Sequence, residues 1–176
     1  MAMNRSGEWT PGLAKKLTDG DTMAQVRDVL LGRAEIRMFE HLIDCSAAPY
    51  VPLNKMDIDS HKRSGELRWD PKNFRLYRSK KQKKDGSITG YELQNELKDK
   101  PVLNANVLDY LLAHKELIPR DWVGRSVFFW GTIYLMGGTP VVRCIQQIAG
   151  VWDQSFRWLS RDFSAADPAI MLHVAK

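Results

Sequence analysis

The sequence has few of the residues that usually mark a catalytic centre or a metal site. Its 176 residues include two cysteines and four histidines. The cysteines, Cys45 and Cys144, lie far apart in the chain, which excludes a disulfide framework and the close ligand spacing of a zinc knuckle. No glycine-rich phosphate loop and no nucleophile motif occurs. We therefore expect no catalytic residue, no bound metal and no cofactor, so that a non-enzyme is favoured over an enzyme.

Long apolar segments are also missing. The longest apolar run has about the length of a strand, well short of the roughly 20 residues that a membrane-spanning helix needs. The first residues, Met1 to Trp9, are mostly polar and lack the apolar core of a signal peptide. These absences predict a cytoplasmic protein that does not enter a membrane.

What the sequence does contain is typical of a folded domain. Hydrophobic residues make up 44% and charged residues 27% of the chain, which are ordinary values for a globular protein. A length of 176 residues indicates one domain. We predict a loosely ordered segment over residues 1–20 and a single α+β domain over residues 21–176.

The last third of the chain carries the clearest structural pattern. Three apolar, aromatic-rich runs cover residues 126–136, 141–148 and 151–159, and Gly137-Gly138 and Ala149-Gly150 separate them. Short runs joined by glycine turns are typical of antiparallel hairpins. We expect these runs to form a meander within a sheet of three to five strands.

Helical spacing precedes this pattern. Residues 23–31 have apolar side chains three and four positions apart. Thr89 and Glu92 match the capping box that begins a helix, and a second amphipathic stretch covers residues 104–118. Asp167-Pro168 indicates a short terminal helix. The expected fold class is therefore α+β, a helical N-terminal half packed on a C-terminal antiparallel β-meander.

Aromatic side chains of the meander form the first candidate site. Alternate residues of a strand point to the same sheet face, so Trp130 and Tyr134 are expected to share a face. One interpretation, which is favoured, is a core on which the helices pack. The other is a platform for flat ligands or peptides. The candidate ligand-binding residues are Trp130, Tyr134, Trp152 and Trp158.

A basic segment is the second candidate site. Residues 62–84 hold ten basic side chains and two acidic ones, although the net charge of the chain is only +5. Basic groups near aromatic residues can follow a phosphate backbone and stack on bases. The favoured alternative is a solvated hairpin tip, because no nucleic-acid-binding fold signature is present. The candidate nucleic-acid-binding residues are Arg75, Arg78, Lys80, Lys81, Lys83 and Lys84.

Asp57, Asp59 and His61 form a third cluster. Carboxylates and imidazoles are suitable ligands for a divalent metal, but the spacing fits no ligand pattern. A helix N-cap at Asp59 or Ser60 explains the cluster more simply. We predict no metal there.

Two stretches of the chain have distinctive sequences. One is KPVLNANVLDYLLAH, residues 100–114, followed by residues 116–119, and the other is VFFWGTIY, residues 127–134. Together they resemble a family of small uncharacterised bacterial proteins, whose members run on through an Arg-Cys strand, matched here by Arg143-Cys144. The resemblance covers about residues 60–170. It implies an accessory or mobile-element gene and carries over no activity, substrate or catalytic residue.

These observations favour a small non-catalytic binding or interaction module that uses its aromatic-rich sheet. Its partner would be a protein surface or a small apolar ligand. The alternatives are a non-specific nucleic-acid-binding protein that uses residues 62–84 and a small enzyme of unidentified class. The half-polar strand over residues 151–159 also leaves open the pairing of two copies as a homodimer.

Overall fold

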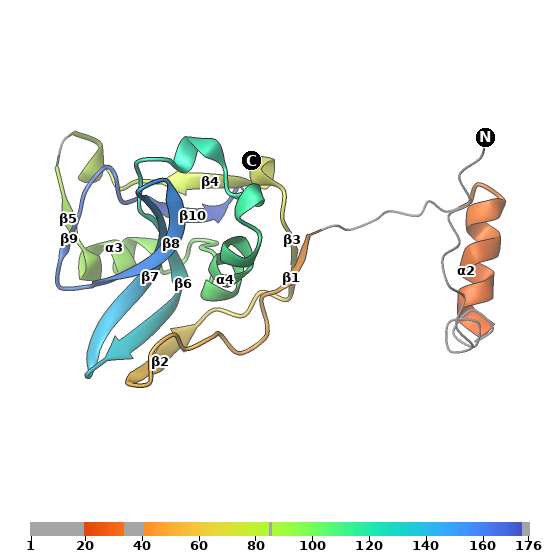
Figure 1. Cartoon of the computed structure of the whole chain (residues 1–176), viewed down its shortest axis with the longest axis horizontal. Coiled ribbons are helices and arrows are strands. Elements are labelled where there is room, and N and C mark those ends of the chain that lie inside the picture. Colours follow the sequence, from red (N-terminus) through yellow and green to blue (C-terminus); the bar gives the residue numbers. More distant parts are fainter. Residues whose placement is uncertain (1–19, 34–40, 85, 174–176) are drawn as a thin grey trace. The chain divides into compact units, whose positions relative to one another are not determined.

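The computed structural model describes residues 20–33, 41–84 and 86–173. The chain forms two compact units, Met1–Glu40 and His41–Lys176 (Figure 1), and each is described by itself. In the first unit, helix α2 covers Gly20–Leu30, which confirms the helix predicted around residues 23–31. The segment predicted to be loose lies outside the described residues up to residue 19.

The second unit is built around a six-stranded sheet. Its strands are β1 Leu42–Asp44, β2 Met56–His61, β3 Glu66–Arg68, β4 Phe74–Tyr77, β5 Ile88–Thr89, β6 Val127–Met136, β7 Thr139–Ile148, β8 Val151–Trp158, β9 Asp162–Phe163 and β10 Ala169–Leu172. The order within the sheet is β4-β10-β6-β7-β8, and β2 pairs with β6 outside this path. Strands β6, β7 and β8 pair antiparallel in sequence order, so the predicted meander is present (Figure 1).

Two helices cover opposite faces of this sheet. They are α3, Gly90–Leu97, and α4, Ala105–Ala113. Leu93 of α3 packs in one cluster with Phe128 of β6, whereas Leu108 of α4 packs in another with Phe129. Because neighbouring residues of a strand point to opposite faces, the helices lie on either side of β6 (Figure 1). Both faces of β6 are therefore buried along most of its length, which explains its nearly continuous apolar sequence.

Helix α3 begins as the sequence predicts. Thr89 Oγ1 accepts a hydrogen bond from Glu92 N, and Glu92 Oε2 accepts one from Thr89 N, each at 3.3 Å. Helix α4 follows Asn104 but ends at Ala113, and a 3-10 turn over Lys115–Leu117 takes up part of the remaining predicted helix. Among the described residues, no helix has the length and apolar character needed to cross a bilayer.

The predicted fold class, α+β with a helical N-terminal half, is wrong. The described residues form ten strands and only three short helices, and strands β1 to β5 all precede α3. These strands are short, and in β2, which is mostly polar, only Met56 is buried. An edge strand needs apolar residues on one face at most, so its sequence resembles that of a loop. For the same reason Asp59 and Ser60, predicted to cap a helix, lie in β2.

The C-terminal segment is a strand rather than the predicted helix. Strand β10 lies between β4 and β6, and three of its four residues are buried. Consecutive apolar residues suit a central strand that is covered on both faces. Asp167, expected to begin a helix, instead accepts hydrogen bonds from Ser164 N and Ser164 Oγ, each at 2.8 Å.

Strand β6 contains a bulge at its centre. Its register against β7 shifts between Phe128 and Ile133. At this point Gly131 N donates to Leu103 O at 2.8 Å, and Gly131 O accepts from Lys62 N at 2.7 Å. A bulge changes which residues share a face. Trp130 and Tyr134 accordingly pack in different clusters, although simple alternation predicts one face for both.

An ion pair between a buried arginine and a partly exposed aspartate joins the meander to α4. The side chain of Arg143 in β7 is 2% exposed, and its guanidinium donates to Asp109 at 2.6 and 3.2 Å. It also contacts Tyr134 Oη at 3.4 Å and Gln154 Oε1. Burial alone would lower the pKa of Arg143, but its hydrogen bonds to Asp109 and Tyr134 outweigh burial and raise that pKa. The charge of Arg143 is therefore compensated inside the fold.

Candidate functional site

A cavity of about 560 Å³ lies between helix α3 and the β2–β6 edge of the sheet, and we call it the α3–β2 cavity. It exists because α3 covers one face of β6, while β2 pairs only with the second half of that strand, from Thr132 onward. Its lining includes Ser60, His61, Lys62, Tyr91, Lys98 and Trp130.

Trp130 forms the aromatic wall of the cavity. It is 5% exposed, and its ring centroid lies 5.2 Å from that of Phe163. The indole Nε1 is buried and has no hydrogen-bond partner among the described residues. Leaving a buried donor unpaired costs about 1–3 kcal/mol, and folded proteins keep few such groups. The indole N–H is therefore an unpaired donor inside the domain rather than a group open to the cavity.

His61 borders the cavity in a fixed orientation. Its Nδ1 lies 2.8 Å from Thr132 Oγ1, and that hydroxyl oxygen also accepts a hydrogen bond from Ala105 N at 3.0 Å. Burial lowers the pKa of His61 below its ordinary value. The imidazole is therefore neutral at pH 7 and adds no charge to the cavity.

Acidification is expected to destabilise the protein in part through His61. Because the pKa of His61 is lower in the folded than in the unfolded state, the unfolded state takes up the proton first as the pH falls below 6.5. Stability that is present above this pH is then lost. Urea unfolding at pH 7 and pH 5 should show a smaller loss for His61→Gln than for the unchanged protein. Equal losses would contradict this role of His61.

The charged side chains of the cavity are positive. Its described lining includes Lys62 and Lys98 and no aspartate or glutamate. Lys62 Nζ donates to Lys98 O at 2.6 Å and to Lys100 O at 3.3 Å. These carbonyls follow the C-terminal end of α3, where a cation complements the helix dipole. Lys62 is therefore held in place by backbone groups. The described residues of the cavity form no ion pair with one another.

The four aromatic residues predicted from the sequence do not form one surface. Trp130 borders the α3–β2 cavity, whereas Tyr134 is fully buried and donates its hydroxyl to Tyr50 O at 2.9 Å. Trp152 packs beside the core cluster under α4, and Trp158 is 37% exposed on the edge strand β8. The register shift in β6 separates Trp130 from Tyr134, and Trp152 and Trp158 lie near opposite ends of β8. Of the four, only Trp130 reaches the cavity.

The basic segment folds against the rest of the domain. Arg78 Nε donates to Ala165 O at 2.7 Å, and Lys81 pairs with Glu92 at 2.8 Å. These contacts occupy two of the six candidate nucleic-acid-binding side chains. The other four are Arg75, exposed on the edge strand β4, Lys80 and Lys83, both exposed, and Lys84, which ends a 3-10 turn.

Aromatic rings near the basic segment are already engaged within the domain. Trp69 stacks on Phe74 with ring centroids 4.5 Å apart, and Tyr77 Oη donates to Glu96 at 3.1 Å. Stacking on bases requires free ring faces. The structure therefore does not bring these rings and the free lysines together as one binding surface.

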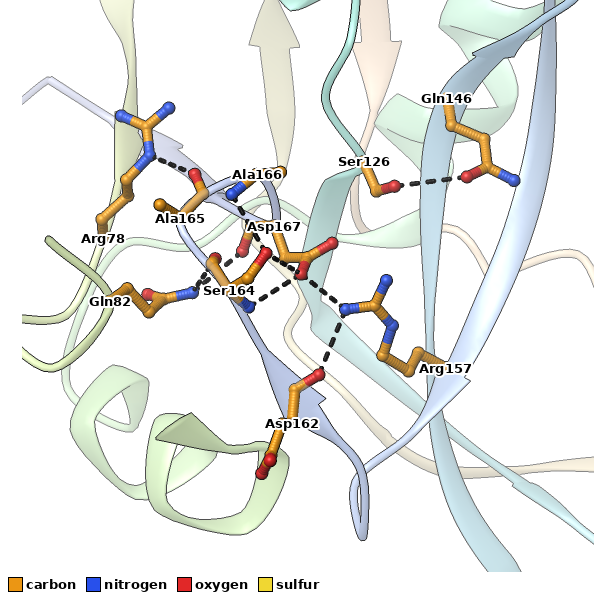
Figure 2. A network of polar contacts seen from close by, with 10 residues as sticks. All are labelled: Arg78, Gln82, Ser126, Gln146, Arg157, Asp162, Ser164, Ala165, Ala166 and Asp167. Carbon is orange, nitrogen blue, oxygen red and sulfur yellow. Dashed lines mark hydrogen bonds and ion pairs between the residues drawn. The ribbon is translucent and has the colours of Figure 1, made fainter. Parts of the chain in front are cut away.

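Figure 2 shows the polar network that anchors the basic segment to the loop over residues 164–167. Gln82 Nε2 donates to Ser164 O at 2.8 Å and to Asp167 O at 3.2 Å. Arg157 approaches Asp167 Oδ2 at 2.7 Å from the side of the meander. Gln82 is fully buried although it stands within a run of lysines. The sequence analysis did not single out Gln82. A glutamine that interrupts a run of lysines was the available signal of its buried position. The side chains of this network are occupied in holding loops together, so the α3–β2 cavity remains the candidate site.

The sequence identified two members of the cavity without connecting them. Trp130 was a candidate platform residue, and His61 belonged to the cluster examined for a metal. Tyr91 and Lys98 were missed, although the capping box at Thr89 and Glu92 indicated the helix that carries them. Tyr91 and Lys98 lie near β2 because β2 pairs with β6, whose residues are about 70 positions further along the chain.

Comparisons of the chain with protein-family models, curated proteins and solved structures find no match. The resemblance noted in the sequence therefore stays a prediction.

Proposed function

We propose that this protein binds a small planar ligand in the α3–β2 cavity and does not catalyse its conversion. The observation that carries the proposal is the cavity itself, about 560 Å³ in volume and bordered by the rings of Trp130 and Tyr91. A flat ligand would pack against these ring systems. Such a ligand gains apolar contact with both.

The size and lining of the cavity support a small molecule. A volume of about 560 Å³ falls within the range of roughly 300–1,000 Å³ that is usual for ligand pockets. Trp130 and the half-exposed Tyr91 supply two ring systems. Ile133 adds an apolar side chain, and the polar side chains of the lining can fix the orientation of a ligand through hydrogen bonds.

Binding fits the cavity better than catalysis does. A general base needs a partner or substrate proton within hydrogen-bond reach and a pKa near the working pH. His61 is hydrogen-bonded to Thr132, and Lys62 is bonded to backbone carbonyls. Among the described lining residues, no two titratable side chains hydrogen-bond to each other.

The test uses the Trp130 indole N–H as a reporter. The chain has six tryptophans, and the Trp130 signal in a ¹H–¹⁵N spectrum is the one that Trp130→Phe removes. We expect titration with quinoline, indole-3-carboxamide and indole-3-carboxylate to shift this signal most among the six. If none of these compounds shifts it at millimolar concentration, the proposal is wrong.

A cavity-filling variant provides the matched control. Ser60→Trp places a large side chain in the cavity from an exposed position of β2 and should abolish the shift. Asp57→Trp adds the same side chain to an exposed position of the same strand outside the described lining and should preserve it. Equal effects of the two variants would contradict binding in the cavity.

A further inference from the structure

We infer that the ligand of the α3–β2 cavity is a planar carboxylate, an anion rather than a neutral or cationic ring. The inference rests on the proposed function and adds the chemical class of the ligand. Its basis is the combination of charge and hydrogen-bond donors along the lining.

The charge of the lining favours an anion. Lys62 and Lys98 border the cavity, and its described lining holds no carboxylate. His61 is neutral at pH 7, because burial lowers its pKa. A charged ligand at the protein surface experiences an effective dielectric well below that of water, so two ammonium groups attract a carboxylate and repel a cation.

The two lysines differ in how many donors they retain. An ammonium group has three N–H donors, and Lys62 uses two of them on the carbonyls of Lys98 and Lys100. One donor of Lys62 is therefore left, and it is held in a fixed place. The exposed side chain of Lys98 has no hydrogen-bond partner among the described residues. It can swing to meet the ligand, so it is the better position for a test.

The uncharged groups of the cavity are compatible with this anion. Tyr91, Gln94 and Asn95 also border the cavity, and their side chains have no partner in the described part of the chain. Each has an O–H or N–H group that can donate to a carboxylate, which only accepts hydrogen bonds. The preference for an anion over a neutral or cationic ring therefore comes from Lys62 and Lys98.

The experiment compares three ligands that share one ring. Indole-3-carboxylate, indole-3-carboxamide and 3-(aminomethyl)indole carry a negative, a neutral and a positive group, and the Trp130 indole shift reports the affinity of each. We expect the carboxylate to bind about tenfold more tightly than the carboxamide, and the amine to bind most weakly. Raising the salt concentration should weaken the carboxylate alone.

Two lysine variants distinguish the effect of a charge at the cavity from the effect of the net charge of the protein. Lys98→Gln should reduce the preference for carboxylate over carboxamide to about threefold or less. Lys115→Gln makes the same change in net charge at an exposed position outside the described lining and should keep the preference. A carboxamide that binds as tightly as the carboxylate would overturn this inference while leaving the proposed function intact. Binding of none of the three compounds would overturn both.

Discussion

Replacing Asp109 by alanine is expected to lower the free energy of unfolding by about 3 kcal/mol, at the lower end of the range for a buried pair because the Asp109 side chain is 29% exposed. The reason is that Arg143, whose side chain is 2% exposed, would keep its charge in the interior without its carboxylate partner. Breaking a buried pair by removing one member is costly, because the remaining ion is desolvated and uncompensated. Thermal unfolding should shift downward by roughly 10 °C, since about 2–4 °C per kcal/mol is usual for a chain of this size.

An exposed ion pair provides the control for this variant. Asp121 lies 3.7 Å from Arg125, with 71% of its side chain exposed. Asp121→Ala should therefore change the stability by less than about 0.5 kcal/mol. The double variant Asp109→Leu/Arg143→Met, which removes both charges, should recover much of the loss. An Asp109→Ala protein as stable as Asp121→Ala would show that Arg143 finds water in the folded state.

Replacing Gly131 by alanine is expected to lower the stability by about 3 kcal/mol, at the upper end of the usual range for overpacking. An added Cβ would lie 2.8 Å from Asn104 Cα, Asn104 N and Leu103 C. All three are backbone atoms just before α4, so no side chain can turn away to make room. The hydrogen bond from Gly131 N to Leu103 O, 2.8 Å long, would be strained as well. Urea unfolding measures the loss.

Gly138 is the matched glycine for comparison. It lies in the β6–β7 turn with φ of 76°, and an added Cβ would meet nothing within 4 Å. Gly138→Ala should therefore cost about 1 kcal/mol, which is the usual penalty of a left-handed backbone for alanine. A Gly131→Ala loss no larger than this would mean that the start of α4 can move away from β6. The Trp130 indole signal should shift in the Gly131 variant and stay in place in the Gly138 variant.

Local signals in the sequence predicted the elements whose partners are close in the chain. Gly137-Gly138 and Ala149-Gly150 placed the two turns of the meander, because a hairpin is specified by its own turn. The capping box at Thr89 and Glu92 placed α3 to the residue, since both hydrogen bonds lie within one turn of helix. Neither signal depends on distant parts of the chain.

The elements that were wrongly predicted from the sequence depend on pairing between segments that are far apart in the chain. Strand β2 is polar because only one of its faces is covered, and strand β10 is apolar throughout because it lies between two others. The bulge at Gly131 depends on Leu103 and Lys62, which come from two different segments. The α3–β2 cavity depends on all of these long-range pairings. The sequence therefore identified Trp130 and His61 singly but not as neighbours of one cavity.

The position of β10 has a consequence for biosynthesis. Residues 169–172 fill the gap between β4 and β6, and they pair with both neighbours. While the ribosome is still holding these residues, the nascent chain can form the meander but cannot close the sheet beside it. Until these four residues pair, the edges of β4 and β6 that they cover stay open to pairing with another chain.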